Sequence, residues 1–91
     1  MSIPRPLRAA AARRTAIAIR RATTGDETAL RRLAALSDRS LSSGPFLLAE
    51  SDGYPVAALD LDSGAILVDP FRVSYDLVDL LKLRARHLEA A

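Results

Sequence analysis

The sequence predicts a small α+β domain in which an antiparallel sheet is covered by two helices. Its expected order is strand, helix, three strands, helix (β-α-β-β-β-α). The chain has 91 residues, of which 49% are hydrophobic, and this proportion favours a packed core over disorder. Strand-like and helix-like apolar spacings follow one another along residues 16–90. All four glycines fall at the expected breaks between these segments, so the local signals agree with the overall layout.

The first strand and the first helix follow each other directly. Residues 16–22 begin with strict alternation, which places Ile17 and Ile19 on one face of a strand. Thr24 and Glu27 have the spacing of a capping box, so a helix is expected to begin there. The positions that recur at helical spacing are Leu30, Leu33, Ala34 and Ser37. The helix is expected to end near the last of these.

Three antiparallel strands are expected next, and turn residues separate them. The expected strands are residues 46–50, 55–61 and 65–68. The pair Asp52-Gly53 is favoured in tight hairpin turns, and Pro55 suits the first position of the returning strand. Asp62-Ser63-Gly64 supplies the second turn. The three strands therefore form a meander.

A last helix is expected at about residues 75–90, capped by Ser74 or Asp76. Its apolar stripe and the residues that widen it are Leu77, Leu81, Ala85, Leu88, Val78 and Leu80. Leu83 lies off this stripe and His87 lies on its border. The helix is thus more broadly apolar than one sheet face needs.

Charge divides the chain into a basic arm, residues 1–15, and a domain, residues 16–91. Residues 1–21 carry six arginines and no acid, whereas residues 22–91 carry seven basic and eleven acidic residues. The arm's anion-binding candidates are Arg5, Arg8, Arg13 and Arg14. They could hold nucleic acid or an anionic membrane weakly, or form part of a targeting segment. Because the domain is acidic, nucleic acid is not expected as its partner.

Several chemistries are not expected from the composition. The chain has no cysteine and one histidine, so disulfides and cysteine- or histidine-rich metal sites are excluded. No apolar run is long enough for a transmembrane helix, and a cytoplasmic location is expected. Twelve of the 13 basic residues are arginine, which we interpret as the bias of a GC-rich, bacterial genome.

The order of elements and several local phrases resemble the N-terminal half of the GNAT-type N-acetyltransferases. The phrases that carry this resemblance are Ile19-Arg20-Arg21-Ala22-Thr23-Thr24-Gly25-Asp26, Leu30-Arg31-Arg32-Leu33, Leu47-Leu48-Ala49-Glu50, Asp52-Gly53, Pro55-Val56-Ala57-Ala58 and residues 65–68. The resemblance covers about residues 16–90. It implies the first four strands and two helices of that fold, and an acetyl-CoA turn after the fourth strand. The later strands of the family are expected to be missing.

The turn that would bind acetyl-CoA departs from the family's pattern, Q/R-x-x-G-x-G/A. Residues 69–76 contain no glycine, and Pro70 lacks an N–H donor. The acids Asp69, Asp76 and Asp79 are expected to bring negative charge there, opposed only by Arg72. Backbone donors and small residues are what a phosphate cradle requires. No cofactor is therefore expected, with Arg72 as the one candidate for binding it, and no catalytic residue is assigned.

Single side chains with chemical potential have structural explanations in this sequence. His87 is expected to be exposed or at an interface, and Tyr54 and Tyr75 to serve turns or packing. Asp60 and Asp62 are expected to be solvated, because metal sites usually need further ligands. No metal site is assigned.

Assembly is the function that the sequence favours most. A domain this small lies near the lower limit for a self-supporting core, and an open strand edge invites pairing. The expected interface residues are Ile66, Val68, Leu80, Leu83 and His87. The first hypothesis is a non-catalytic GNAT-like module that binds a protein partner or forms a homodimer. Two alternatives are an acetyl-CoA-dependent N-acetyltransferase completed by dimerisation or a partner chain, and a binder of nucleic acid or anionic membrane through the arm.

Overall fold

The computed structural model describes residues 16–90 of the chain. It contains a four-stranded antiparallel sheet in the order β1-β2-β3-β4, together with two α-helices. The elements are β1 (Ile17–Arg21), the 3-10 turn η1 (Thr24–Asp26), α2 (Glu27–Leu36), β2 (Phe46–Ser51), β3 (Tyr54–Asp60), β4 (Ile66–Val68) and α3 (Tyr75–Ala90). The expected α+β class and order of elements are confirmed.

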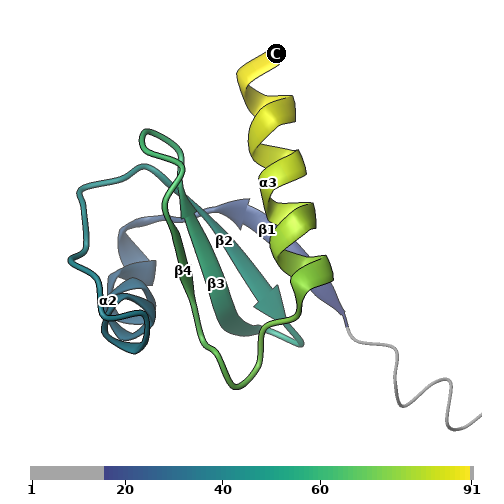
Figure 1. The fold of residues 1–91 in the computed structure, drawn as a ribbon. Helices are drawn as coiled ribbons and strands as arrows, with labels where there is room; N and C mark the ends of the chain where they lie inside the picture. Colours follow the sequence, from purple (N-terminus) through teal and green to yellow (C-terminus); the bar gives the residue numbers. More distant parts are fainter. Residues whose placement is uncertain (1–15, 91) are drawn as a thin grey trace, which may run out of the picture.

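The two helices lie on opposite faces of the sheet, giving three layers (Figure 1). Alternation along β2 divides its side chains between them. Phe46 and Leu48 pack with α2, whereas Leu47 and Ala49 pack with α3. All four are buried. The central strands are therefore apolar on both faces, as strands covered on both sides must be.

The capping box lies one residue before the expected one and caps the 3-10 turn η1, which leads into α2. The N–H of Thr23 donates to the Asp26 carboxylate over 2.7 Å, and the N–H of Asp26 donates to the Thr23 carbonyl over 2.9 Å. Glu27 instead pairs with Arg31 one turn further on. The prediction that Thr24 and Glu27 form the box was wrong, because Thr23 and Asp26, which have the same spacing one residue earlier, form it instead.

The expected hairpin turn is confirmed and connects β2 to β3. Asp52 and Gly53 both have positive φ, 53° and 81°, which is the requirement of a type I′ turn. Asp52 also fixes the start of β1. Its N–H donates to the Ala16 carbonyl over 2.8 Å, and its side chain accepts from the Ala16 N–H over 3.0 Å.

Helix α3 starts at the expected cap and packs along the expected stripe. Ser74 Oγ accepts a hydrogen bond from the N–H of Leu77, so Ser74 is the cap. Leu77, Leu81 and Ala85 are buried against the sheet. Leu88 continues the stripe but is 41% exposed, and the last turns of α3 project beyond the strands (Figure 1). This end of the helix carries apolar surface that the sheet does not cover.

Candidate interaction surfaces

The structure separates the five expected interface residues into two groups, one on each flank of α3. Ile66 and Val68 lie on β4 and face the side of α3 that carries Val78 and Lys82. A helix turns about 100° per residue, so Leu80 and His87 lie on the opposite flank and Leu83 lies beside them, on the side of α3 turned away from the sheet. These three side chains are exposed, with Leu80 and Leu83 each at 41%. The residues therefore do not form one continuous patch.

The first surface is a groove of about 790 Å³ between β4 and α3. It arises because α3 packs over β2 and β3 and leaves the same face of β4 open. The residues that line it are Ile66, Val68, Pro70, Val73, Ser74, Tyr75, Val78, Asp79 and Lys82. Phe71, in the turn before α3, is 87% exposed, and Tyr75 is 91% exposed. Tyr75 was expected to serve a turn or packing, and the exposure of these two aromatic rings could not be inferred from residue spacing.

The outer edge of β4 is partly closed by the residue that ends α2. Two backbone hydrogen bonds show which residues beside and along β4 face β3. The Asp60 N–H donates to the Ala65 carbonyl, and the Asp69 N–H donates to the Val56 carbonyl. By alternation, the N–H and C=O of Val68 face outward. The Ser37 hydroxyl accepts from that N–H over 2.8 Å and donates to that carbonyl over 3.1 Å. In the part of the chain that the structure describes, the β4 edge therefore offers the backbone groups of Ile66 but not those of Val68.

The second surface combines the outer edge of β1 with the other flank of α3. Ala22 N–H donates to the Phe46 carbonyl and Asp52 N–H to the Ala16 carbonyl, so even-numbered residues of β1 face β2. The odd-numbered residues Ile17, Ile19 and Arg21 therefore turn their backbone groups outward. Among the described residues, the one contact to these groups is from Arg20 Nη1 to the Arg21 carbonyl, at 3.3 Å.

Ile17 belongs to this second surface and was missed as an interface residue. It shares a face of β1 with Ile19, which packs against the α3 core cluster. The Ile17 side chain is 43% exposed. Its alternation with Ile19 was visible in the sequence, but its exposure depends on β1 being an edge strand.

The turn from β4 to α3 uses its own backbone donors. The N–H of Phe71 donates to Asp69 Oδ1 over 3.0 Å, and the N–H groups of Arg72 and Val73 both donate to the Asp69 carbonyl over 3.0 Å. Ser74 occupies the N–H of Leu77. A phosphate cradle needs such donors free to point at a ligand, and here the chain has already taken these four.

Asp69 was expected to bring open negative charge to this turn. Instead, its carboxylate is buried and paired with arginine. Arg32 Nη1 donates to Asp69 Oδ2 over 3.0 Å, and Arg72 Nε lies 3.8 Å from the same oxygen. Burial alone would raise the pKa of Asp69, but hydrogen bonds from the Phe71 N–H and from Arg32 outweigh it and lower the pKa. Asp76 and Asp79 remain exposed.

Arg72, the one candidate for cofactor binding, stacks against an aromatic ring. Its guanidinium carbon lies 4.3 Å from the centroid of the Tyr54 ring, and that of Arg32 lies 4.8 Å away. Arg32 also donates to the Pro55 carbonyl. Tyr54 thus joins α2, β3 and the turn after β4 in one contact, which supports the expected packing role for this tyrosine.

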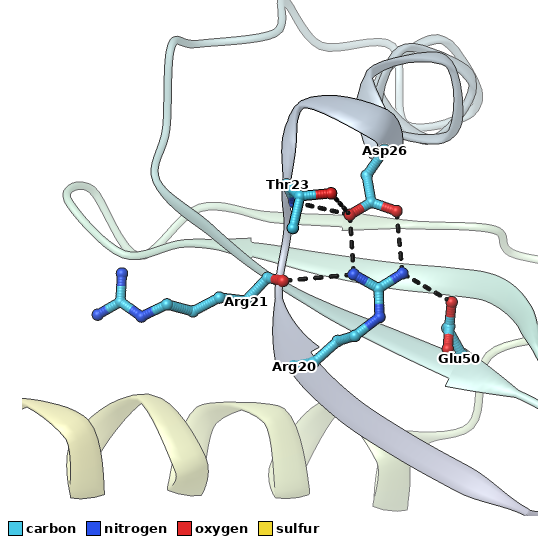
Figure 2. Close-up of polar contacts among 5 residues, drawn as sticks. All are labelled: Arg20, Arg21, Thr23, Asp26 and Glu50. Atoms are coloured by element: carbon cyan, nitrogen blue, oxygen red, sulfur yellow. Dashed lines mark hydrogen bonds and ion pairs between the residues drawn. The ribbon is translucent and has the colours of Figure 1, made fainter.

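A second polar cluster connects β1, the start of α2, and β2 (Figure 2). Arg20 donates two hydrogen bonds to the Asp26 carboxylate, at 2.8 and 2.9 Å, and a third to Glu50 at 3.0 Å. The hydrogen bonds from Arg20 and from the Thr23 N–H lower the pKa of Asp26 far below its ordinary value. The same bonds to Asp26 and Glu50 raise the pKa of Arg20. We interpret the cluster as structural, because each of its charged side chains has a hydrogen-bonded partner of opposite sign.

The remaining acidic candidates have structural partners. Asp60 is buried, so the expectation that it is solvated was wrong. Its carboxylate accepts hydrogen bonds from the Ser42 hydroxyl and from the N–H groups of Asp62 and Ser63. The Ser42 bond leads the effects that lower the pKa of Asp60. Asp60 thus organises the turn before β4, while Asp62 is exposed as expected.

The described residues contain neither a metal-binding group nor a membrane-spanning helix. Within residues 16–90, no three histidine, cysteine or acidic side chains are grouped so that they could hold a metal ion. No helix in the same part of the chain combines the length and the apolar character that crossing a membrane requires. The arm residues Arg5, Arg8, Arg13 and Arg14 lie outside the described residues.

No protein-family profile, curated protein or solved structure was found to match this chain.

Proposed function

We propose that this chain is a non-catalytic, GNAT-like module whose function is to associate with a second copy of itself. The observation that carries the proposal is the apolar surface on one flank of α3. Leu80 and Leu83 are each 41% exposed there, in a helix that already buries another stripe against the sheet. Soluble domains rarely leave such apolar side chains grouped on one surface unless it binds something.

The β4–α3 turn supports a binding role over a catalytic one. The N–H groups of Phe71, Arg72 and Val73 donate to Asp69, so they are not free for a pyrophosphate. Acetyl-CoA-dependent chemistry would have to displace these bonds or rely on other donors. The proposal therefore treats the resemblance to the acetyltransferases as one of fold, and assigns no cofactor.

Self-association is tested by sedimentation velocity over a concentration series. We expect the fraction of a species of twice the 9.8 kDa chain mass to increase with concentration. Leu80→Glu and Leu83→Glu should each shift the protein to the monomer, because a carboxylate cannot be buried without a partner. Lys82→Glu is the matched control, since it places the same group on the groove flank of α3.

Two results would contradict the proposal. The first is a monomer at every concentration, and the second is a dimer that Leu80→Glu and Leu83→Glu leave unchanged although their circular dichroism matches the wild type. A dimer that only Lys82→Glu dissociates would transfer the interface to the groove. If the chain is a monomer and binds an unrelated protein through the groove, its function is to bind that protein and not a second copy of itself.

A calorimetric titration with acetyl-CoA separates this proposal from the enzyme. We expect no saturable heat, since the donors of the turn are already used. Saturable binding that is lost in Arg72→Ala but kept in Arg84→Ala would overturn the proposal and support an acetyltransferase. Arg84 is the matched control because it is also exposed, but lies on α3 away from the turn.

A further inference from the structure

We infer that two copies of this chain pair through the outer edges of their β1 strands, antiparallel, with the two-fold axis at Ile19. This inference rests on the proposed self-association and specifies its geometry. It would join two four-stranded sheets into one continuous sheet. Edge strands with unpaired backbone groups are the usual place for such pairing.

The β1 edge is favoured over the β4 edge because of the backbone groups that each can offer. On β1, Ile17, Ile19 and Arg21 turn their N–H and C=O groups outward. On β4, the Ser37 hydroxyl occupies both outward groups of Val68 and leaves only Ile66. Because each paired residue adds backbone hydrogen bonds, the three outward residues of β1 make the longer ladder.

The β1 edge is complementary to itself in an antiparallel pairing centred on Ile19. Ile17 of one copy then lies opposite Arg21 of the second copy, and Ala18 lies opposite Arg20. No arginine faces another arginine, so the pairing avoids like charges in direct opposition. The aliphatic stem of Arg21 can cover the exposed Ile17 while its charged end remains in water. Within residues 16–90, the pairing replaces one bond, the weak 3.3 Å contact on the Arg21 carbonyl.

The same arrangement covers the exposed flank of α3. Ile17 and Ile19 lie on the face of the sheet that α3 covers. Val78 and Lys82 face β4, so the opposite flank, with Leu80 and His87, is turned toward β1, and Leu83 lies beside it on the side away from the sheet. Pairing at β1 brings these flanks of the two copies toward the axis. The exposure of Ile17 on the strand and of Leu80 on the helix is thus explained by one contact.

The absence of cysteine allows a direct test of the register. Ile17→Cys and Arg21→Cys are mixed as two separately purified full-length proteins and oxidised. Paired strand residues have Cα atoms about 5.5 Å apart, which is within the range of a disulfide. We expect the mixture to form a cross-linked heterodimer. Each variant oxidised alone should cross-link little, because identical positions would be roughly 13 Å apart along the ladder, given about 3.3 Å per residue.

A third variant, Ile66→Cys, and a measurement of the oligomeric state complete the test. Sedimentation velocity on the reduced cysteine variants establishes whether they still associate. A dimer with no cross-link between positions 17 and 21 overturns the β1 pairing while the proposed self-association stands. Efficient cross-linking of Ile66→Cys with itself has the same consequence and assigns the β4 edge instead. A monomer in sedimentation overturns the proposed function and this inference together.

Discussion

Ser37 and Val68 are joined by two hydrogen bonds through one hydroxyl group, although 31 positions separate them in the chain. The hydroxyl accepts from the Val68 N–H and donates to the Val68 carbonyl. Ser37 is also the residue at which α2 ends. The end of α2, on one face of the sheet, thus closes part of the β4 edge. The groove beside α3 borders the same strand on the other face.

Ser37→Ala should destabilise the domain, because it leaves both backbone groups of Val68 without a protein partner. An unsatisfied, partly covered polar group costs about 1–3 kcal/mol. The free energy of unfolding from urea denaturation should decrease by an amount in this range. The amide hydrogen of Val68 should also exchange faster with solvent. Ser43→Ala is the matched control, since Ser43 is exposed and has no hydrogen bond among those of the described residues. Equal stability of the two variants would contradict the role given to Ser37.

Acid should destabilise the domain over a defined range of pH. Asp26, Asp60 and Asp69 all have a lowered pKa in the folded protein. A carboxylate whose pKa is lower when folded stabilises the protein above its unfolded pKa, near 3.9. This stabilisation is lost as pH falls further toward the folded pKa. We expect urea midpoints to be nearly constant from neutral pH to about pH 5 and to decrease steeply below about pH 4.

Asp69→Asn separates one contribution to this acid dependence. The variant should be less stable at neutral pH, because Arg32 loses a charged partner. Its stability should also decrease less steeply below about pH 4 than that of the wild type. Asp62→Asn, an exposed aspartate, is the control and should follow the wild type throughout. Identical acid profiles for Asp69→Asn and the wild type would exclude Asp69 from the effect.

The fold could be predicted because its signals are local. The positive φ angles at Asp52 and Gly53 follow from residue types that tolerate this backbone region, and the apolar stripe of α3 follows from the helical period. The capping box was placed one residue too late because two neighbouring pairs have its spacing, Thr23 with Asp26 and Thr24 with Glu27. Asp26 is fixed by Arg20, which comes from the preceding strand, and no spacing rule for helix caps includes that contact.

The surfaces were harder to predict than the fold for the same reason. Arg32 meets Asp69 across 37 positions, so the sequence could not show that the acid after β4 is neutralised. The exposure of Ile17 depends on the strand order, which places β1 at an edge. The expected interface residues divide between two flanks of α3. To predict this division, one would have to know the direction in which α3 crosses the sheet. Each of these properties exists only in the folded arrangement.

The Arg20–Asp26 pair should be stronger than an ordinary surface ion pair. It is bidentate, and the Asp26 side chain is only 13% exposed. In a double-mutant cycle with Arg20→Met and Asp26→Asn, we expect a coupling of about 1 kcal/mol. The comparison is Glu27–Arg31, whose side chains are 62% and 69% exposed. That pair should couple by only about 0.3–0.5 kcal/mol.

Salt provides the check on this comparison. The coupling of Glu27 and Arg31 should nearly disappear in high salt, because both groups are in solvent. The coupling of Arg20 and Asp26 should decrease less, since it includes two hydrogen bonds to a largely covered carboxylate. Equal couplings for the two pairs, with equal salt dependence, would show that the cluster in Figure 2 is no more than surface charge.

Gly53→Ala tests whether the β2–β3 turn depends on backbone conformation or on space. Gly53 has φ of +81°, and a Cβ atom added there would meet nothing within 4 Å. Any loss of stability must therefore come from holding a side-chain-bearing residue in the left-handed region, which costs about 1–2 kcal/mol. Gly25→Ala is the control, because Gly25 lies in η1 and its nearest neighbour is Thr23 Oγ1 at 3.6 Å. In urea denaturation, Gly53→Ala should lose this amount, while Gly25→Ala stays within about 0.5 kcal/mol of the wild type. If Gly53→Ala is as stable as the wild type, the type I′ assignment is wrong.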